Sequence, residues 1–238
     1  MRAIGFSTGA IAYGDFQKAL DVLSAENLSC VELSALRMSE VEVLVDAIPR
    51  LQLSEYSYIS FHAPSTYSSS DEKWLTDLLY SRIPESWPIV VHPDAICNFT
   101  LWTRFGRRIA IENMDRRKPI GRNVRELQII FDQLPEAGLC FDLGHARQCD
   151  SSMTDAFLML TAFRDKLIQI HLSEVNSESQ HEAVSYGAKL AFQQVASLIP
   201  NSLPIILESR VTTGQISSEI EVALQALSKT AIDEYCYA

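Results

Sequence analysis

Residues 88–94 read PIVVHPD, and residues 108–115 read RIAIENMD. Each stretch is a short run of apolar residues that ends in polar side chains, His92 in the first and Glu112 with Asn113 in the second. Continuous apolar runs without alternation are typical of parallel strands that are covered on both faces of a sheet. The polar residues are therefore expected at the C-terminal ends of neighbouring parallel strands.

Similar runs recur along the whole chain. We interpret eight of them as strands, at Ile4–Ser7, Val31–Ser34, Tyr58–His62, Ile89–His92, Ile109–Asn113, Leu139–Leu143, Ile168–Leu172 and Ile205–Ser209. Their first residues lie 20 to 37 positions apart, which is close to the length of one strand-helix unit. The shortest interval separates the fourth and fifth strands, so the helix between them is expected to be short.

Segments between these strands show the apolar spacing of helices. The clearest are Asp15–Ala25, Asp71–Leu79, Val124–Leu134, Asp155–Phe163 and Ser218–Leu227. Regular alternation of strands and helices is typical of a parallel sheet in an α/β fold. The sequence therefore predicts a single (β/α)8 TIM barrel with eight parallel strands, forming one domain over residues 1–238.

The composition argues against several classes of protein. Lys and Arg total 20 against 30 Asp and Glu, so the net charge is −10, which disfavours nucleic acid as a partner but leaves a local basic patch open. No apolar run reaches about 18 residues, the length that a membrane-spanning helix needs. The cysteines form no C-x-x-C pair, and they are Cys30, Cys97, Cys140, Cys149 and Cys236. We therefore expect reduced thiols, a cytoplasmic location and no membrane partner.

Six consecutive predicted strands carry an imidazole or a carboxylate at their C-terminal ends. In chain order these residues are His62, His92, Glu112, Asp142, His171 and Glu208. Taken singly, a histidine or an acid after a strand is more often a hydrogen-bonded structural residue than a ligand. Taken together, they meet on the active-site face of a barrel, with no Lys or Arg at the same strand ends to balance the carboxylates. Histidine and carboxylate ligands in such a cluster favour a divalent cation.

The motifs at these positions resemble those of the xylose isomerase-like TIM barrels, a superfamily that includes sugar-phosphate isomerases and epimerases as well as endonuclease IV. The resemblance covers nearly the whole chain, and its motifs are IGFSTG (4–9), VELSA (31–35), HAPS (62–65), VHPD (91–94), IENMD (111–115), FDLGHA (141–146), HLSEVN (171–176) and ILES (206–209). In the isomerase and epimerase branch it implies one divalent metal (Zn, Mn, Co or Mg) held by Glu112, Asp142, His171 and Glu208.

This branch implies a metal-dependent isomerase or epimerase that acts on a small sugar or sugar phosphate, which is the function we expect from the sequence. Glu112 and Glu208 would exchange protons with the substrate through a metal-stabilised enediolate. The expected substrate contacts come from His62, His92, His145, Asn113, Arg116 and Arg117.

The endonuclease IV branch implies a different site and is the main alternative. It adds ligands at the positions of His62, His92, His145 and His181, with a further acidic residue two positions before the last. Ser179 stands at that acidic position, so a third metal would lose a ligand. The alternative function is a zinc phosphodiesterase that acts on abasic DNA or another phosphoester. A barrel that binds a metal without turnover is a third hypothesis, although none of the four central ligands is lost.

A basic segment follows the fifth strand. It contains Arg116, Arg117, Lys118, Arg122 and Arg125. One interpretation is capture of a phosphate group, either on a sugar phosphate or on a nucleic-acid backbone. The other is a solvated loop and helix start with no ligand.

Overall fold

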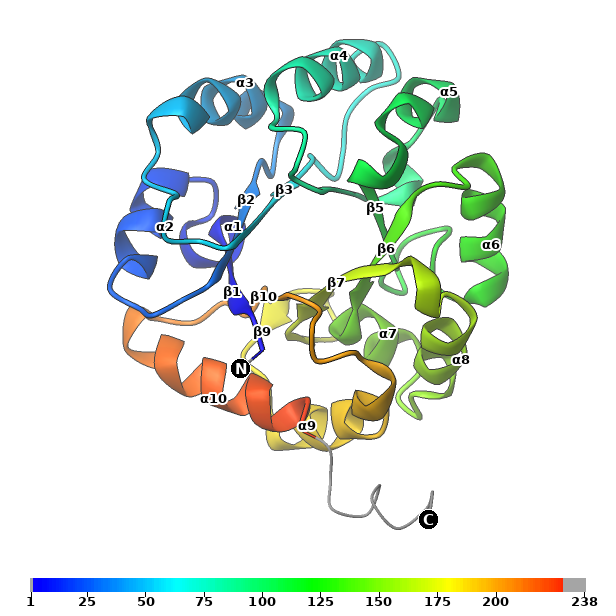
Figure 1. The fold of residues 1–238 in the computed structure, drawn as a ribbon. Coiled ribbons are helices and arrows are strands. Elements are labelled where there is room, and N and C mark those ends of the chain that lie inside the picture. Colours follow the sequence, from blue (N-terminus) through cyan, green and yellow to red (C-terminus); the bar gives the residue numbers. More distant parts are fainter. Residues whose placement is uncertain (1, 229–238) are drawn as a thin grey trace.

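The computed structural model describes residues 2–228, in which eight parallel strands close into a barrel surrounded by helices (Figure 1). Around the barrel the strands follow the order β1, β10, β7, β6, β5, β4, β3, β2. They are β1 (Ile4–Ser7), β2 (Cys30–Ser34), β3 (Tyr58–His62), β4 (Ile89–Val91), β5 (Ile109–Glu112), β6 (Gly138–Asp142), β7 (Leu167–Leu172) and β10 (Ile205–Leu207). The predicted (β/α)8 barrel and all eight predicted strands are confirmed, with ends that differ by at most two residues.

Helices connect successive strands on the outside of the barrel. They are α1 (Thr8–Ala12), α2 (Phe16–Leu23), α3 (Met38–Ala47), α4 (Glu72–Arg82), α5 (Phe99–Trp102), α6 (Val124–Gln133), α7 (Leu143–Cys149), α8 (Thr154–Ala162), α9 (Tyr186–Gln193) and α10 (Ile216–Ala226). The five segments with predicted helical spacing correspond to α2, α4, α6, α8 and α10. Helix α5, between the fourth and fifth strands, has only four residues, as the short interval predicts.

Successive side chains of β5 point alternately toward the outer apolar core and toward the barrel interior, where the site lies. Ile109 and Ile111 of β5 belong to the large apolar core between the strands and the helices. Because successive side chains point to opposite faces, Ala110 and Glu112 face the barrel interior. Inside the barrel, Val90, Ala110 and Cys140 form a small separate apolar cluster. Glu112 lies one interior position further toward the C-terminal end, so on this side of the barrel the polar site stands above apolar side chains.

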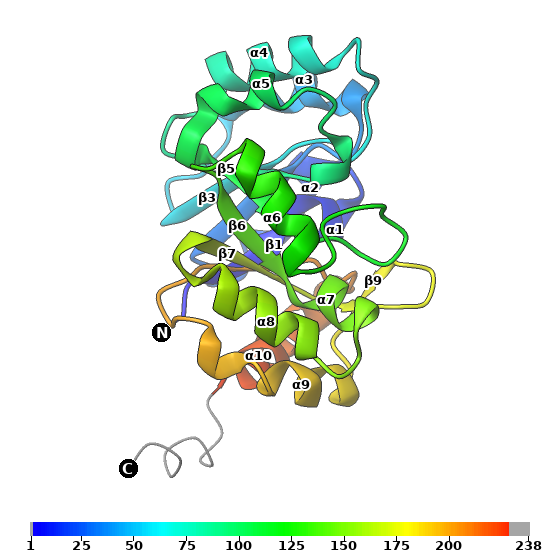
Figure 2. The ribbon, with the colours of Figure 1, turned by 90° about the vertical axis from the view of Figure 1, so that its right-hand side faces the viewer.

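Two additional segments rise from the C-terminal end of the barrel. Strands β8 (Glu174–Val175) and β9 (His181–Glu182) pair antiparallel to form a hairpin after β7. Figure 2 shows this hairpin and the loop after β5 projecting from the same end of the barrel, away from the N-terminus. Both segments therefore belong to the wall around the barrel mouth.

The structure also bears on the expectations for the cysteines and for a membrane-spanning helix. Cys30, Cys97, Cys140 and Cys149 are free thiols, whereas Cys236 lies outside the described residues. Within residues 2–228 no helix combines the length and the apolar character needed to cross a bilayer. The cytoplasmic location and the extent of the domain over residues 1–238 stay predictions.

Barrel closure requires a glycine where β1 meets β2. Gly5 pairs with Cys30, and a Cβ atom on Gly5 would lie 1.7 Å from the Cys30 carbonyl oxygen. This oxygen belongs to the backbone of the neighbouring strand, so the clash cannot be relieved by a change of rotamer. The close approach of the two strands therefore depends on the missing side chain.

We predict that Gly5→Ala lowers the free energy of unfolding by about 3 kcal/mol or more, because the two strands must separate to admit the methyl group. Gly214→Ala is the matched control, since a Cβ atom there meets nothing within 4 Å. Chemical denaturation of both variants measures the difference. Equal stabilities would contradict this account of barrel closure.

Candidate metal centre

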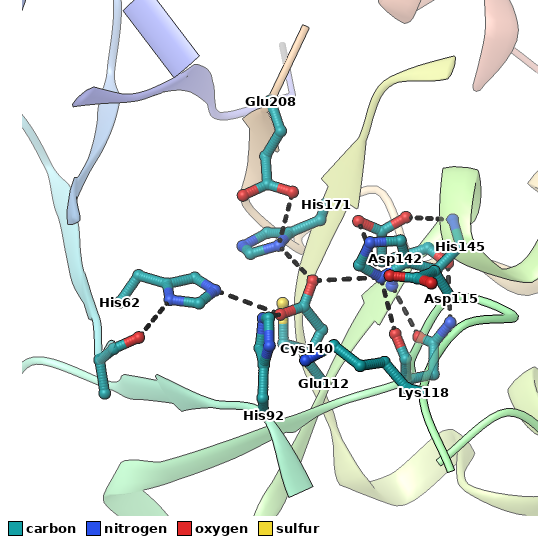
Figure 3. Close-up of polar contacts among 12 residues, drawn as sticks. His62, His92, Glu112, Asp115, Lys118, Cys140, Asp142, His145, His171 and Glu208 are labelled. Atoms are coloured by element: carbon teal, nitrogen blue, oxygen red, sulfur yellow. Dashed lines mark hydrogen bonds and ion pairs between the residues drawn. The ribbon is translucent and has the colours of Figure 1, made fainter. Parts of the chain in front are cut away.

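The C-terminal ends of four adjacent strands bring one set of ligands together (Figure 3). Glu112 ends β5, Asp142 ends β6, His171 lies on β7 and Glu208 directly follows β10. One ligand atom from each of these residues lies within 4.8 Å of the others. The structure thus assembles the four side chains that the sequence motifs single out, although they are far apart in the chain.

Glu112 occupies the centre of this cluster, with only 1% of its surface exposed. Its Oε2 atom lies 3.2 Å from Nε2 of His62 and 3.0 Å from Nε2 of His92. Its Oε1 atom lies 3.0 Å from Nδ1 of His171 and 3.6 Å from Nδ1 of His145. Each oxygen of this carboxylate therefore faces a different pair of imidazoles. His62, His92 and Glu112 make a second set of three ligand atoms within 4.8 Å of one another.

Asp142 joins the central set to a third one, with His145 and His181. It caps helix α7, where its Oδ1 atom accepts a hydrogen bond from the backbone N–H of His145 at 2.6 Å. Its buried Oδ2 atom has no hydrogen-bond partner and lies 3.5 Å from Nδ1 of His145. An unpartnered carboxylate oxygen in a buried cluster is a favourable position for a cation.

Burial and charge shift the pKa values of the cluster in opposite directions. Burial, with the nearby charges of Glu112 and Glu208, raises the pKa of Asp142 to about 7. Burial would also raise the pKa of Glu112, but the adjacent His171 and His92 hold it well below its usual value. Burial would lower the pKa of His62, but its contact with Glu112 and the charges of Glu32 and Glu208 raise it to about 9. Without a metal, protonated imidazoles thus balance the buried carboxylates, and the same donor set fits divalent metal ions.

A cavity of about 520 Å³ opens above this cluster, within the size range of small-molecule sites. The predicted site residues that line it are His62, His92, Glu112, His145, His181, Glu208 and Arg117. Asn113 and Arg116 are not among the lining residues. Asn113 instead joins β5 to β6, because its side-chain amide bonds the backbone N–H and carbonyl of Asp142 at 2.7 and 2.9 Å.

Solved structures share this architecture, although no protein-family model and no curated protein matches the sequence. Endonuclease IV from Thermus thermophilus superposes with a TM-score of 0.60 at 17% identity, covering 95% of this chain and 99% of its own. The 3-keto-D-glucoside 4-epimerase from E. coli gives 0.58 at 11% identity, covering 96% and 100%. A protein from Anabaena variabilis assigned as a sugar phosphate isomerase/epimerase gives 0.56 at 11% identity, covering 93% and 88%. The chain has the TIM-barrel fold of these structures. Superposition at identities this low shows the fold alone.

The basic segment after β5 is mostly engaged in contacts with other parts of the chain. Arg116 donates to the Ser177 carbonyl at 2.8 Å, and Arg117 pairs with Asp115 and reaches the carbonyl of Glu178 at 3.2 Å. These contacts fasten the loop after β5 to the β8–β9 hairpin. Arg122 pairs with Glu126, and Lys118 pairs with Asp94. Arg117 and Lys118 line the cavity, so they are the members of the segment placed to attract an anionic substrate.

Arg210 and Glu32 are the charged residues of the cavity and the cluster that the sequence motifs did not single out. Arg210 lines the cavity two positions after Glu208, and its guanidinium carbon lies 4.9 Å from the ring centroid of the exposed Tyr13. Nothing in the sequence links Arg210 to Tyr13, because the contact spans the closure of the barrel. Glu32, within VELSA, is fully buried inside the barrel and lies 3.2 Å from His171. A lone acidic residue inside an apolar strand is the signal that could have identified Glu32.

Ser179 occupies the position where the resemblance implies an acidic ligand. Its hydroxyl donates to Oδ1 of Asp115 at 3.1 Å and also contacts the side-chain amide of Gln148 at 2.7 Å. This network holds the tip of the hairpin against the loop after β5. The third ligand set therefore consists of Asp142, His145 and His181, and three protein ligands are sufficient for a cation with open positions.

We predict that the metal-free protein loses stability as the pH rises from about 6.5 to 9. His62 has a folded-state pKa of about 9 against its usual 6.5, so its stabilising contribution is complete below pH 6.5 and is lost as the pH passes 9. The raised pKa values of His145 and His171 act in the same direction. The lowered pKa values of His92 and His181 affect stability only below about pH 6.5.

Thermal unfolding in the presence of a chelator measures this dependence of stability on pH. The shift of the His62 pKa alone contributes on the order of 3 kcal/mol to the free energy of unfolding. Saturating divalent cation is expected to abolish the slope, because the cation then balances the carboxylates in place of protons. His62→Gln is expected to reduce the slope without cation. A metal-free protein whose stability is constant or rising over this interval would contradict the prediction.

Proposed function

We propose that this barrel is a metal-dependent enzyme that hydrolyses a phosphoester of a small molecule. The observation that supports this proposal best is the position of Glu112 between two pairs of imidazoles, with both of its oxygens engaged. A buried carboxylate in this position suits a ligand shared by two cations. Each of its oxygens already contacts two imidazoles, whereas a general base in an isomerase needs an oxygen free for the substrate.

The described residues offer overlapping sets of ligands for such cations. His62, His92 and Glu112 form one, and Asp142, His145 and His181 form another on the opposite side of the central set. Imidazole-rich sets favour Zn, Mn or Co over Mg. When bound, divalent cations in paired sites activate water and stabilise the leaving oxygen of a phosphoester.

The side chains at the cavity have separate tasks in this proposal. Glu208, with 13% of its side chain exposed, faces the cavity from the end of β10 and orients the reacting water. Burial lowers the pKa of His181 to about 4, so its imidazole is neutral near pH 7 and available as a ligand. Arg210, Arg117 and Lys118 attract the phosphate group of the substrate to the cavity.

Size and charge favour a small substrate over a nucleic acid. The cavity of about 520 Å³ matches a molecule of sugar-phosphate or nucleotide size. The net charge of −10 opposes the binding of a long polyanion. A small phosphoester therefore fits the site better than abasic DNA does.

The second candidate is the isomerase or epimerase expected from the sequence, acting on a small sugar or sugar phosphate. The observation in its favour is that Glu112, Asp142, His171 and Glu208 form a complete set for one cation, with Glu208 accessible from the cavity. In this alternative, Glu208 and Glu112 would exchange protons with a substrate held at the cation. The two candidates share the cation and differ in the bond that is broken.

Hydrolysis of bis(p-nitrophenyl) phosphate by the zinc- or manganese-loaded protein tests the first candidate. We expect Glu112→Gln to lower the number of bound cations by at least one and the rate by at least about 100-fold, because an amide cannot bridge two cations as a carboxylate does. Release of p-nitrophenolate and elemental analysis give the two readouts. Glu72→Gln is the matched control, because Glu72 is equally buried on α4, outside the cavity lining.

The same preparation, incubated with sugars and sugar phosphates in deuterium oxide, tests the second candidate. Deuterium incorporation at a carbon beside the carbonyl, without phosphodiester hydrolysis, would overturn the first candidate in favour of the second. A Glu112→Gln variant that keeps its full number of cations would also count against the bridging role.

We predict that Arg210→Ala raises KM for the phosphoester about 10-fold, the loss expected for one charge-assisted hydrogen bond. Within residues 2–228 Arg210 forms no ion pair, so its charge is available to a ligand. Arg125→Ala serves as the control, because Arg125 is exposed on α6 and is absent from the cavity lining. Steady-state kinetics of both variants give the comparison, and equal KM values would contradict the assignment.

A further inference from the structure

The cavity above the metal centre has walls of two different kinds. The residues that line it at the ends of β4, β5, β6 and β10, or after them, are charged or carry an imidazole, such as His92, Lys118 and Arg210. The residues that line it from β1, β2 and the segments directly after them are Ser7, Gly9, Ala10, Ser34, Ala35 and Leu36. These residues, which we call the neutral wall, carry no ionisable side chain.

The neutral wall lies across the barrel from the basic end of the cavity. In the closed order of strands, β1 is opposite β5 and β2 is opposite β6. Figure 1 shows β1 and β2 side by side on one side of the ring, with β5 and β6 on the other. Arg117 and Lys118 follow β5 and line the cavity there. A ligand that fills the cavity therefore meets cations at one end and an uncharged surface at the other.

The polar groups of the neutral wall are mostly engaged with one another. The hydroxyls of Ser7 and Ser34 lie 2.6 Å apart, and both side chains are buried. The backbone N–H of Ser34 donates to Oγ1 of Thr8 at 2.9 Å. Because one serine hydroxyl donates to the other, the pair keeps a single hydroxyl hydrogen for a ligand. The wall therefore offers a ligand a hydrogen bond but no charge.

Leu36 gives the neutral wall an apolar surface at the cavity. It packs against the start of α1, because a Cβ atom on Gly9 would lie 2.8 Å from its Cδ2 atom. Leu36 nevertheless keeps 39% of its surface exposed. Ala10 and Ala35 add only methyl groups to the same wall. Covering this surface with an apolar face of a ligand is favourable, because it removes apolar area from water.

We infer that the substrate is a phosphoester whose organic group is uncharged and has an apolar face, and that the neutral wall binds this group. The class includes nucleoside and aryl phosphates and excludes bisphosphates and phosphorylated acids. A second anionic group would lie against the neutral wall without a cation to balance its charge. The inference rests on the proposed function, because it takes the phosphate as bound at the ligand cluster.

A second anion site beside the neutral wall is the competing explanation, because two arginines approach it. Arg37 follows Leu36, but it pairs with Glu40 at 2.6 Å and is absent from the cavity lining, so this pair brings no net charge. Arg210 borders the wall, with its guanidinium carbon 4.9 Å from the ring centroid of Tyr13. A second anion would therefore depend on Arg210, which the phosphate also attracts.

Two phosphonates that differ in one charge test the inference on the unaltered protein. They are 4-carbamoylbenzylphosphonate and 4-carboxybenzylphosphonate, which have the same shape and lack the ester bond that the enzyme would cleave. We expect the zinc-loaded protein to bind the amide at least about 10-fold more tightly in titration calorimetry, because the wall leaves the carboxylate unbalanced. Equal affinities, or tighter binding of the carboxylate, would overturn the inference.

The variant Leu36→Lys shows whether this preference arises at the neutral wall. A lysine there supplies the missing positive charge, so we expect the preference for the amide to fall about 5-fold, through tighter binding of the carboxylate. Val43→Lys is the matched control, because Val43 is exposed on α3 outside the cavity lining and the substitution adds the same charge. A preference that changes equally in the two variants, or in neither, would overturn the inference.

Failure of the proposed function gives a different result in the same titrations. A zinc-loaded protein that binds neither phosphonate has no phosphate site at the ligand cluster, which would refute the proposed function and the inference with it. A protein that binds both phosphonates without preference would keep its phosphate site and refute the inference alone.

Discussion

Like-charged groups gathered in a closed sheet are the constraint on which this structure depends. Glu32, Glu112, Asp142 and Glu208 reach the interior or the mouth of one barrel, where little water is present to separate their charges. Five imidazoles surround them, and every histidine of the chain belongs to this group. Protons on the histidines or divalent cations among the ligands are the two ways to balance such a cluster. The chemistry of the site and the stability of the fold are therefore linked.

The architecture could be predicted from the sequence because it depends on local pattern. Apolar runs such as PIVV and IAIE, repeated at intervals close to one strand-helix unit, specify a parallel barrel without reference to any contact. The barrel then determines which side chains meet, since all strands end on one face. This is why residues as distant as His62 and Glu208 could be placed in one site from the sequence alone.

The remaining parts of the site depend on information that a single sequence does not contain. Arg116 and Arg117 are neighbours in the chain, yet only Arg117 lines the cavity, because the direction of each side chain is set by the hairpin that it contacts. Arg210 was missed because its stacking partner, Tyr13, lies at the other end of the chain. Glu32 was missed because its partners, Ser60, Gln169 and His171, come from two other strands. Pattern predicts the position of a strand end, whereas the partner of each side chain follows from packing.

The fastening of the β5 loop to the β8–β9 hairpin has a consequence for how new specificities could arise on this scaffold. On that side, arginine-to-carbonyl bonds, the Asp115–Ser179 contact and the Gln148 amide hold the wall in place, so a substitution there disturbs several interactions at once. At the rim where β1 meets β10, the exposed pair of Tyr13 and Arg210 has few other contacts among the described residues. Substitutions at the rim near β1 and β10 therefore disturb few interactions, so this part can vary between related proteins with little loss of stability. The wall near β5 and β7 is expected to vary less, because its contacts support the metal centre.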